Sequence, residues 1–425
     1  MRLVSILSLL AVAMLVLVSR HDAAIQLAGL GMALALGAGA SWHILRAAQF
    51  ATISWSKIFL LAIALRVLAL FAVPILEDDY FRYLWDAYRF ATTGSPYGAA
   101  PAAFFSDASV PLKFQSILNF INYPDVPTIY GPVMQLMFLF GYIWAPGQVA
   151  ALQIQNVVLD LILIGLLARA GAGRRWLLLY AISPLVLKEA IITAHPDGLV
   201  GIFAVAGFIY LRRPYLGGGL LGLAVATKVS ALVLLPFLLS RGAWRAVLAV
   251  AGVLLACYLP FLLMPGSELT ALSSFAQHWR FNPLLFSGIE AIFGLRYSRP
   301  LAGIFIILLL AWLYWADWRA GLQRWSIPSV DRAFGAVLIF APVVNPWYLL
   351  WLLPFAVLRP SRTVWAATFV LPLSYINGNN LAQFGWRQFD LPIAITLIEI
   401  AVLASMAWLD WRRPLLTSST SHSIR

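Results

Sequence analysis

The stretch VPILEDDYFRYLWDAYRF, residues 73–90, places three acidic residues, Glu77, Asp78 and Asp79, directly after an apolar run. Aromatic residues and arginines follow the acids at once. The apolar run, residues 57–76, is long enough to cross a bilayer as a helix. The acids therefore mark the point where the chain leaves the hydrocarbon, and a polar, aromatic segment begins at the membrane surface.

The composition of the whole chain agrees with this interpretation. Its 425 residues are 62% hydrophobic and only 11% charged, with a mean hydropathy of +0.86, whereas soluble proteins carry about a quarter charged residues. The net charge is +12, but the arginines stand in short pairs between apolar runs, as they do in cytoplasmic loops. We therefore expect an all-α polytopic membrane protein, and no nucleic-acid partner. The single cysteine, Cys257, excludes an intramolecular disulfide.

The basic pairs predict the topology. With the N-terminus cytoplasmic and an uncleaved first span, one threading puts every pair on the cytoplasmic side, namely Arg174/Arg175, Arg212/Arg213, Arg241/Arg245, Arg319/Arg324, Arg359/Arg362 and Arg412/Arg413. The predicted spans are residues 3–19, 23–44, 57–76, 148–168, 176–192, 198–211, 246–263, 300–316 and 392–411. Two short excursions turn near Lys228 and Asn345, so we expect broken half-helices around an internal cavity. The prediction is one domain, 1–425, with about 12–14 crossings and both termini cytoplasmic.

The only long hydrophilic connection is residues 77–129, which the threading places outside. Its start predicts a helix with one polar stripe and aromatic residues on the other faces, and such a helix is expected to lie in the headgroup plane. The stripe is Asp79, Arg82, Asp86, Arg89 and Thr93. Gly94, Pro96 and Gly98 should end this helix.

Two explanations of the three acids remain open. Acids favour helix N-termini, and Asp78 could simply cap the helix. Alternatively, adjacent like charges raise at least one carboxyl pKa, which gives a group that exchanges protons near neutral pH. Arg82, one turn further on, would keep Asp79 ionised and ready to act as a base.

These motifs resemble the GT-C superfamily of polyprenyl-phosphate-sugar-dependent glycosyltransferases, most closely bacterial mannosyltransferase-like members. The resemblance rests on EDDYFRYLWDAYRFATTGSPYG (77–98), with weaker echoes in YGPVMQ (130–135), AHPDG (194–198), ATKVSALVLLPFLL (226–239), HWRFN (278–282) and NPWYLLWLLPF (345–355). It implies a GT-C-like bundle in the bacterial inner (plasma) membrane, with its active site on the extracytoplasmic face. The implied reaction moves a sugar, which we expect to be mannose, from polyprenyl phosphate to a lipid or glycan acceptor, with inversion.

The resemblance also suggests residue roles. Family members commonly have a catalytic Asp followed by Arg-Tyr three and four residues later, and Asp79, Arg82 and Tyr83 have this spacing. Asp79 is therefore our first choice for the general base, Asp78 the second, and Glu77 would position a partner or a metal. One departure is Ala87, where close members often have Gly.

The departing phosphate requires cations and the sugar requires polar and aromatic partners. Lys228, His195, His278 and Arg280 are the candidate cations, because each is expected on the outer side. The two histidines and Arg280 have simpler explanations as well: His195 as part of a turn, and His278 and Arg280 as interfacial anchors. Asp197 could bind acceptor or cap a helix. Arg82, Tyr130 and Trp347 complete the predicted substrate-binding set, with the tryptophan stacking on a sugar ring.

We expect no cofactor. The triplet Glu77–Asp79 could bind Mg²⁺ or Mn²⁺ through its carboxylates, but a lipid-phosphate donor needs no metal to deliver its sugar, so metal independence is favoured. A membrane transporter or lipid flippase is the alternative function. It would concentrate charges near mid-membrane and show repeat symmetry, whereas this chain places them towards the outer rim.

Overall fold

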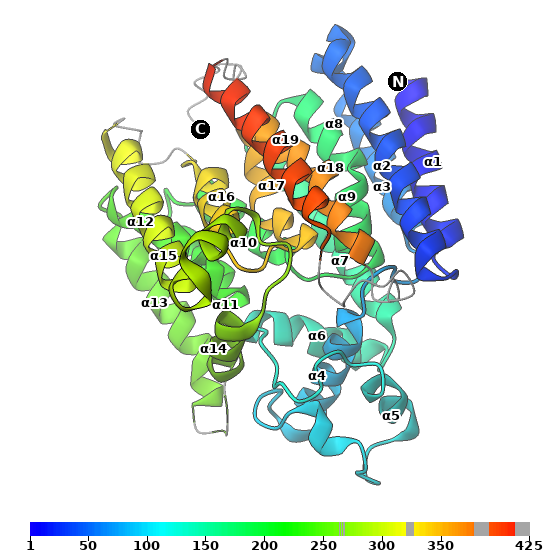
Figure 1. Cartoon of the computed structure of the whole chain (residues 1–425), viewed down its shortest axis with the longest axis vertical. Helices are drawn as coiled ribbons and strands as arrows, with labels where there is room; N and C mark the ends of the chain where they lie inside the picture. The colour runs from blue at the N-terminus through cyan, green and yellow to red at the C-terminus, as the bar shows by residue number, and fades with distance from the viewer. Residues whose placement is uncertain (263, 265, 267, 320–326, 378–390, 413–425) are drawn as a thin grey trace.

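The structure is a helical bundle with a smaller helical lobe at one end (Figure 1). The computed structural model describes residues 1–262, 264, 266, 268–319, 327–377 and 391–412. In these ranges the only strand-like contact is an isolated bridge between Phe281 and Val343. The all-α prediction is therefore confirmed for the described part of the chain. Arg324, Arg413 and most of NGNN (377–380) lie outside the described residues.

The N-terminal half supplies one side of the bundle. Its helices are α1 (Arg2–Val18), α2 (Ala23–Arg46), η1 (Ala48–Ala51), α3 (Trp55–Ala69), α7 (Val149–Arg169), α8 (Arg174–Ile182), α9 (Pro184–Val186) and η3 (Leu187–Ile192). The third predicted span, 57–76, ends early at Ala69. Pro74 lacks an N–H and its ring would clash with the preceding turn, so the helix cannot continue to the acids. η3 is a π-helix, a rare form that is frequent at functional sites.

The C-terminal half completes the bundle. It contains α10 (Gly198–Ile209), α11 (Pro214–Thr227), η4 (Val229–Leu234), α12 (Leu235–Leu239), α13 (Trp244–Tyr258), η5 (Leu259–Phe261), α14 (Glu268–His278), α15 (Leu284–Arg319), α16 (Val330–Phe340), η6 (Pro346–Tyr348), α17 (Leu349–Leu358), α18 (Arg362–Val370), η7 (Leu371–Asn377) and α19 (Ile393–Arg412). The predicted breaks between helices are present: Lys228 is extended between α11 and η4, and Asn345 is extended before η6. The passages through the membrane stay a prediction. α15 is two helices that join at a kink, since Gly294 has a φ of 75° and a ψ of 169°.

Several helices are suited to a bilayer. Among the described residues five helical segments are long and apolar enough to cross one: α2, α7, α13 together with η5, α15 and α19. Six further apolar helical segments have only 10–17 residues, short of the roughly 20 residues that a full span needs. The polytopic membrane prediction is confirmed, while the count of about 12–14 crossings stays a prediction.

The lobe contains α4 (Asp79–Thr93), η2 (Pro101–Phe104), α5 (Leu112–Leu118) and α6 (Pro132–Trp144). α4 forms as predicted and ends at Gly94, whose φ of 77° is left-handed. The aromatic face of α4 is buried against α5 and α6. Part of its polar stripe is buried too: Asp86 is 2% exposed and accepts a hydrogen bond from Gln135 at 3.0 Å. Much of α4 therefore packs on protein rather than on headgroups.

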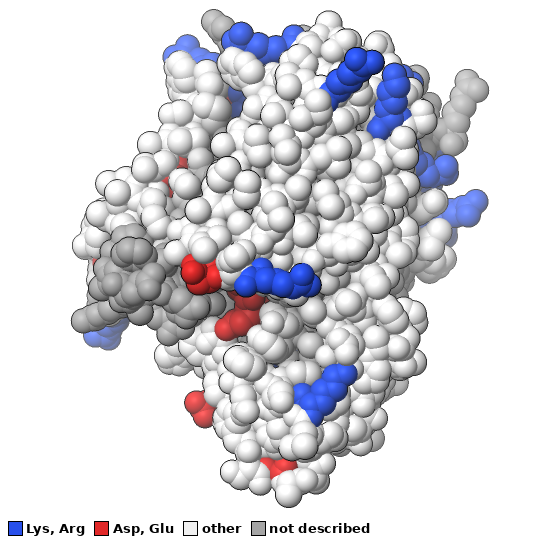
Figure 2. All heavy atoms as spheres, turned by 90° about the vertical axis from the view of Figure 1, so that its right-hand side faces the viewer, with Lys and Arg blue, Asp and Glu red and all other residues white. Residues whose placement is uncertain are grey.

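The charges are segregated along the bundle. On the face shown in Figure 2, most Lys and Arg gather at the end away from the lobe, and the visible acidic residues lie nearer the lobe. α1 begins and α19 ends at the basic end (Figure 1). The acids that begin α4 thus lie between the bundle and the lobe.

Candidate active site

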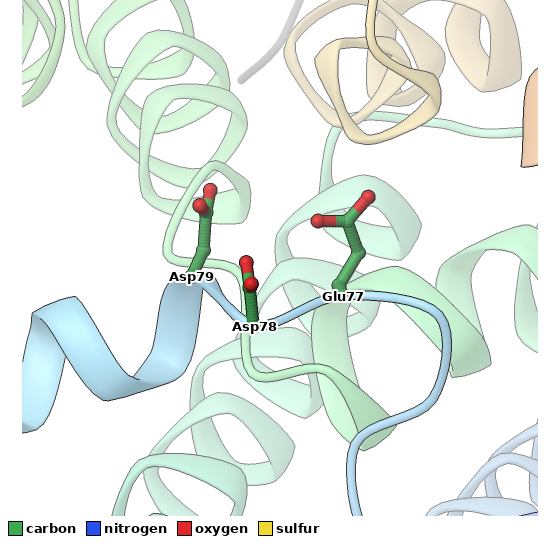
Figure 3. A group of neighbouring side chains, drawn as sticks. All are labelled: Glu77, Asp78 and Asp79. Carbon is green, nitrogen blue, oxygen red and sulfur yellow. The ribbon is translucent and has the colours of Figure 1, made fainter. Parts of the chain in front are cut away.

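The three acids stand on a loop that two helices of the bundle anchor. Leu76, just before them, has a left-handed φ of 57°, and its N–H donates to Gln26 of α2 at 3.0 Å. Asp78 is the N-cap residue of α4 but its side chain makes no capping hydrogen bond. Asp78 therefore stands at the N-cap position without capping the helix through its carboxylate, while Asp79 lies in the first turn, where an acid favours the helix dipole. All three carboxylates point to one side of the loop (Figure 3).

That side is a cavity of about 520 Å³ between the lobe and the bundle. The acids form one wall together with Arg82 and residues 122–130. The opposite side comes from Lys228, the segment 275–281, and residues near positions 343–348 and 374–375. A cavity of this size is typical of a small-molecule site, and it brings together segments from distant parts of the chain.

The electrostatics of the acids follow mainly from burial. Burial raises the pKa of Asp78 to about 7, and the charge of Asp79 adds to the shift. Burial also raises the pKa of Glu77 well above its usual range, although the charge of Lys188 opposes it. The expected proton-exchanging carboxyl is present, but desolvation rather than like-charge repulsion is its main cause. Burial raises the pKa of Asp79 as well, and the charge of Arg82, which lowers this pKa, does not cancel the rise. The expectation that Arg82 keeps Asp79 ionised is therefore not supported.

The hydrogen bonds of Arg82 go to the backbone of the outer loop rather than to an acidic side chain. Its guanidinium donates to the carbonyls of Asn122, Tyr123 and Val126, at 3.3, 2.9 and 2.8 Å. These three residues line the cavity. Arg82 therefore shapes the cavity wall. Tyr130 also lines the cavity, and its hydroxyl donates to Asp79 Oδ2 at 3.4 Å.

Lys228 lies where the predicted turn put it, and it lines the cavity. Its Nζ is 2.7 Å from Asp197 Oδ1 and stands over the rings of Tyr348 and Trp351, at 4.5 and 4.7 Å from their centroids. Asp197 itself is 1% exposed and does not line the cavity. Asp197 pairs with Lys228 from the protein side, outside the cavity lining, and this position does not support direct binding of an acceptor.

His195 is also outside the cavity lining. It is 1% exposed, and its ring stacks on Trp347 with centroids 4.1 Å apart. Burial lowers the pKa of His195 well below its usual value, and the charges of Lys188 and Lys228 lower it further. The imidazole is therefore neutral, so this position does not support the predicted role as a cation facing phosphate.

The remaining predicted residues do line the cavity. His278, Arg280 and Trp347 all contribute to its wall. Arg280 is 45% exposed and pairs with Glu290 at 2.9 Å, while His278 is exposed at the end of α14. Their roles in substrate binding stay predictions.

Sequence reasoning missed a polar group beneath the cavity. Lys188 and Glu189 lie in η3, both 1% exposed, with Nζ and Oε2 3.1 Å apart. Tyr375, which lines the cavity, donates to Glu189 at 2.9 Å. The signal was available as a Lys-Glu pair inside the predicted span 176–192, because ionisable residues within a span are usually functional.

The acids also have the spacing of a possible metal site. Ligand oxygens of Glu77, Asp78 and Asp79 all lie within 4.8 Å of one another, and carboxylates are suitable ligands for Mg²⁺ or Mn²⁺. The predicted metal independence is not tested by this geometry and stays a prediction.

The comparisons with known proteins point to one enzyme class. A family model described as "Alpha-(1->6)-mannopyranosyltransferase, N-terminal domain" matches residues 4–245, more than half of the chain. A polyprenol-phosphate-mannose-dependent alpha-(1-2)-phosphatidylinositol pentamannoside mannosyltransferase of Mycolicibacterium smegmatis is 27% identical over 309 residues, covering 68% of this chain and 69% of that protein. A second protein of that organism, named "Probable alpha-(1->6)-mannopyranosyltransferase", is 23% identical over 433 aligned positions, covering 81% and 73%. No solved structure matches this chain.

These matches agree with the motif resemblance and give no support to the transporter or flippase alternative. Because the family model covers more than half of its length, the chain belongs to the alpha-(1->6)-mannopyranosyltransferase family, which confirms the predicted GT-C glycosyltransferase class.

Proposed function

We propose that this protein transfers mannose from a polyprenyl phosphate to a lipid or glycan acceptor at the extracytoplasmic face of the membrane, with inversion at the anomeric carbon. The observation that carries the proposal is the composition of one cavity, which Glu77, Asp78, Asp79 and Lys228 all line. The polyprenol-phosphate-mannose dependence in the name of one relative supports the choice of donor.

The proposed chemistry is a single displacement. The acceptor hydroxyl attacks the anomeric carbon of the mannosyl phosphate while Asp79 takes its proton, a contribution of about 10²–10⁴-fold to the rate. The new bond joins the acceptor oxygen to the anomeric carbon, and the bond to the phosphate oxygen breaks with its electron pair. Because attack and departure occur on opposite faces, the configuration inverts. Lys228, with His278 and Arg280, stabilises the charge that develops on the departing polyprenyl phosphate.

The side of the membrane follows from charge. Arginines and lysines collect on cytoplasmic loops, and most of those visible in Figure 2 lie at the end of the bundle away from the lobe. On this reasoning the basic end and both termini are cytoplasmic, and the cavity opens on the other side. A polyprenyl tail keeps its phosphate at the interface, close to the depth of the cavity.

The experiment is a transfer assay with purified protein. The protein is incubated with labelled polyprenyl-phosphate mannose and a membrane lipid extract, and the labelled product is identified by mass spectrometry. Asp79→Asn should insert and fold normally but lose about 10²–10⁴-fold in turnover. Asp107→Asn, an acid of the lobe outside the cavity lining, is the matched control and should stay active.

Near-normal turnover of Asp79→Asn would remove this residue as the base. Movement of labelled donor across vesicles, with no mannosylated product, would instead support the flippase alternative.

A further inference from the structure

His195 occupies an unusual segment between η3 and α10. Ala194, just before it, has a left-handed φ of 58°, which is costly for a residue other than glycine. The backbone is held on both sides: the His195 N–H donates to the Glu189 carbonyl at 3.0 Å, and Asn156 of α7 donates to the His195 carbonyl at 3.3 Å. Strain that is fixed so firmly by neighbours is typical of positions where the side chain must be placed accurately.

The edge of the His195 ring leads to the proposed base. Nδ1 is 3.1 Å from the hydroxyl of Tyr83, with which it shares a hydrogen bond. The Tyr83 and Tyr130 rings meet edge to face, with centroids 5.1 Å apart. Tyr130 in turn donates to Asp79 Oδ2 at 3.4 Å. The other edge is backed by Glu189, whose Oε2 lies 3.6 Å from Nε2.

The face of the same ring supports Trp347. The two planes are only 12° apart, with centroids separated by 4.1 Å. Trp347 lines the cavity whereas His195 does not, so the imidazole backs the indole from the protein side. A neutral imidazole suits this position, since it stacks without introducing a buried charge.

We propose that His195 is a positioning residue with two separable tasks: its edge orients the carboxylate of Asp79 through Tyr83 and Tyr130, and its face fixes the indole of Trp347 as a platform for the mannosyl ring. The inference rests on the proposed function, and it assigns to this histidine a role that requires no contact with substrate. One side chain thus keeps the base and the sugar platform in a fixed relation.

The two tasks can be separated by two substitutions. His195→Phe keeps a flat ring against Trp347 but loses the hydrogen bond to Tyr83. His195→Asn keeps a polar atom near the position of Nδ1 but loses the stacked ring. Tyr83→Phe is the matched control for the first variant, because it removes one hydroxyl and leaves the stacking of its ring on Phe138, at 4.7 Å, in place.

Steady-state kinetics with polyprenyl-phosphate mannose should show a split between kcat and KM. His195→Phe and Tyr83→Phe should lower kcat about 10- to 100-fold, as expected for a misplaced base, with a donor KM within about twofold of wild type. His195→Asn should mainly raise the donor KM, by about 3- to 10-fold, because the platform is less firmly held. Combining His195→Phe with Tyr83→Phe should add little to either single change, since both interrupt the same path.

Thermal unfolding of each variant shows how much folded protein is assayed. Suppose that the wild type is active but the two His195 variants change kcat and KM in the same way, or lose activity only in proportion to the loss of folded protein. Either result would overturn the inference while leaving the proposed function in place. A wild type that transfers no mannose would overturn the proposed function, and the inference with it.

Discussion

Replacing Lys228 by methionine should affect both stability and catalysis, and the two effects can be separated. Lys228 Nζ lies 2.7 Å from Asp197 Oδ1, which also accepts from the indole N–H of Trp351 at 2.6 Å. Asp197 is 1% exposed and the Lys228 side chain 23%. Removing one partner of a fully buried pair costs about 3–5 kcal/mol, because the other charge is left uncompensated. Since Lys228 is partly solvated by the cavity, we expect about 2–3 kcal/mol for Lys228→Met.

The informative variant is the double substitution Lys228→Met with Asp197→Asn. It removes both charges, so no uncompensated carboxylate remains, and much of the lost stability should return. Activity should not return, because the departing phosphate still lacks its cation, and loss of one such electrostatic group costs about 10²–10³-fold in kcat. Thermal unfolding in detergent measures the first effect, and the mannosyl transfer assay measures the second.

The reasoning has a clear point of failure. A double variant that regains activity along with stability would show that Lys228 serves folding alone. The catalytic cation would then have to be sought at His278 or Arg280, which also line the cavity.

Three further predictions concern pH, metals and sidedness. Burial raises the pKa of Asp78 to about 7, so this carboxyl loses its proton as pH rises through neutrality, and the rate of transfer should increase over that range. Asp78→Asn should remove this increase, and an unchanged pH profile in the variant would contradict the prediction. Chelation with EDTA should leave turnover unchanged, and a loss that added Mn²⁺ or Mg²⁺ restores would establish a metal site at the acids instead. In a Cys257→Ser background, a membrane-impermeant maleimide added from outside should label Ser106→Cys in the lobe but not Arg212→Cys at the basic end; the reverse pattern would invert the proposed topology.

The sequence predicted much of the fold because the relevant signals are local. Apolar length and helix-breaking residues identify a span from its own residues, so the turn at Lys228 and the end of α4 at Gly94 were both predicted correctly. The same signals gave the side of the membrane expected for each polar motif. These signals could not show how deeply each motif is buried in the protein, and the burial of His195 and Asp197 differs from the prediction. Both belong to a motif expected outside, yet both lie behind the cavity wall.

The packing of α4 shows the same limit. A polar stripe beside aromatic faces predicts a helix at an interface, but the pattern is identical whether the interface is lipid or another helix. The structure buries Asp86 beside Gln135 of α6, so part of the polar stripe makes its hydrogen bonds with protein groups rather than with water. The Lys188–Glu189 pair was overlooked for a related reason. Its two charges neutralise each other and stand within a strongly apolar run, so the segment was interpreted only as a span.

Buried charges in this protein have different tasks, and their hydrogen-bond partners and their place relative to the cavity separate them. Asp160 has both oxygens satisfied, one by Arg66 at 2.7 Å and one by Tyr180 at 2.6 Å. Arg66 also donates to the Ala181 carbonyl at 2.6 Å, and neither member of this pair lines the large cavity. Such a pair joins α3, α7 and α8. Lys228 has one carboxylate partner and otherwise two ring faces, while an ammonium carries three donors. Because Lys228 also lines the cavity, we expect its remaining donors to meet an incoming phosphate without loss of the Asp197 pair. A buried pair outside the cavity lining, with both carboxylate oxygens satisfied, stabilises the bundle, whereas a lysine with donors to spare beside the cavity is prepared for a ligand.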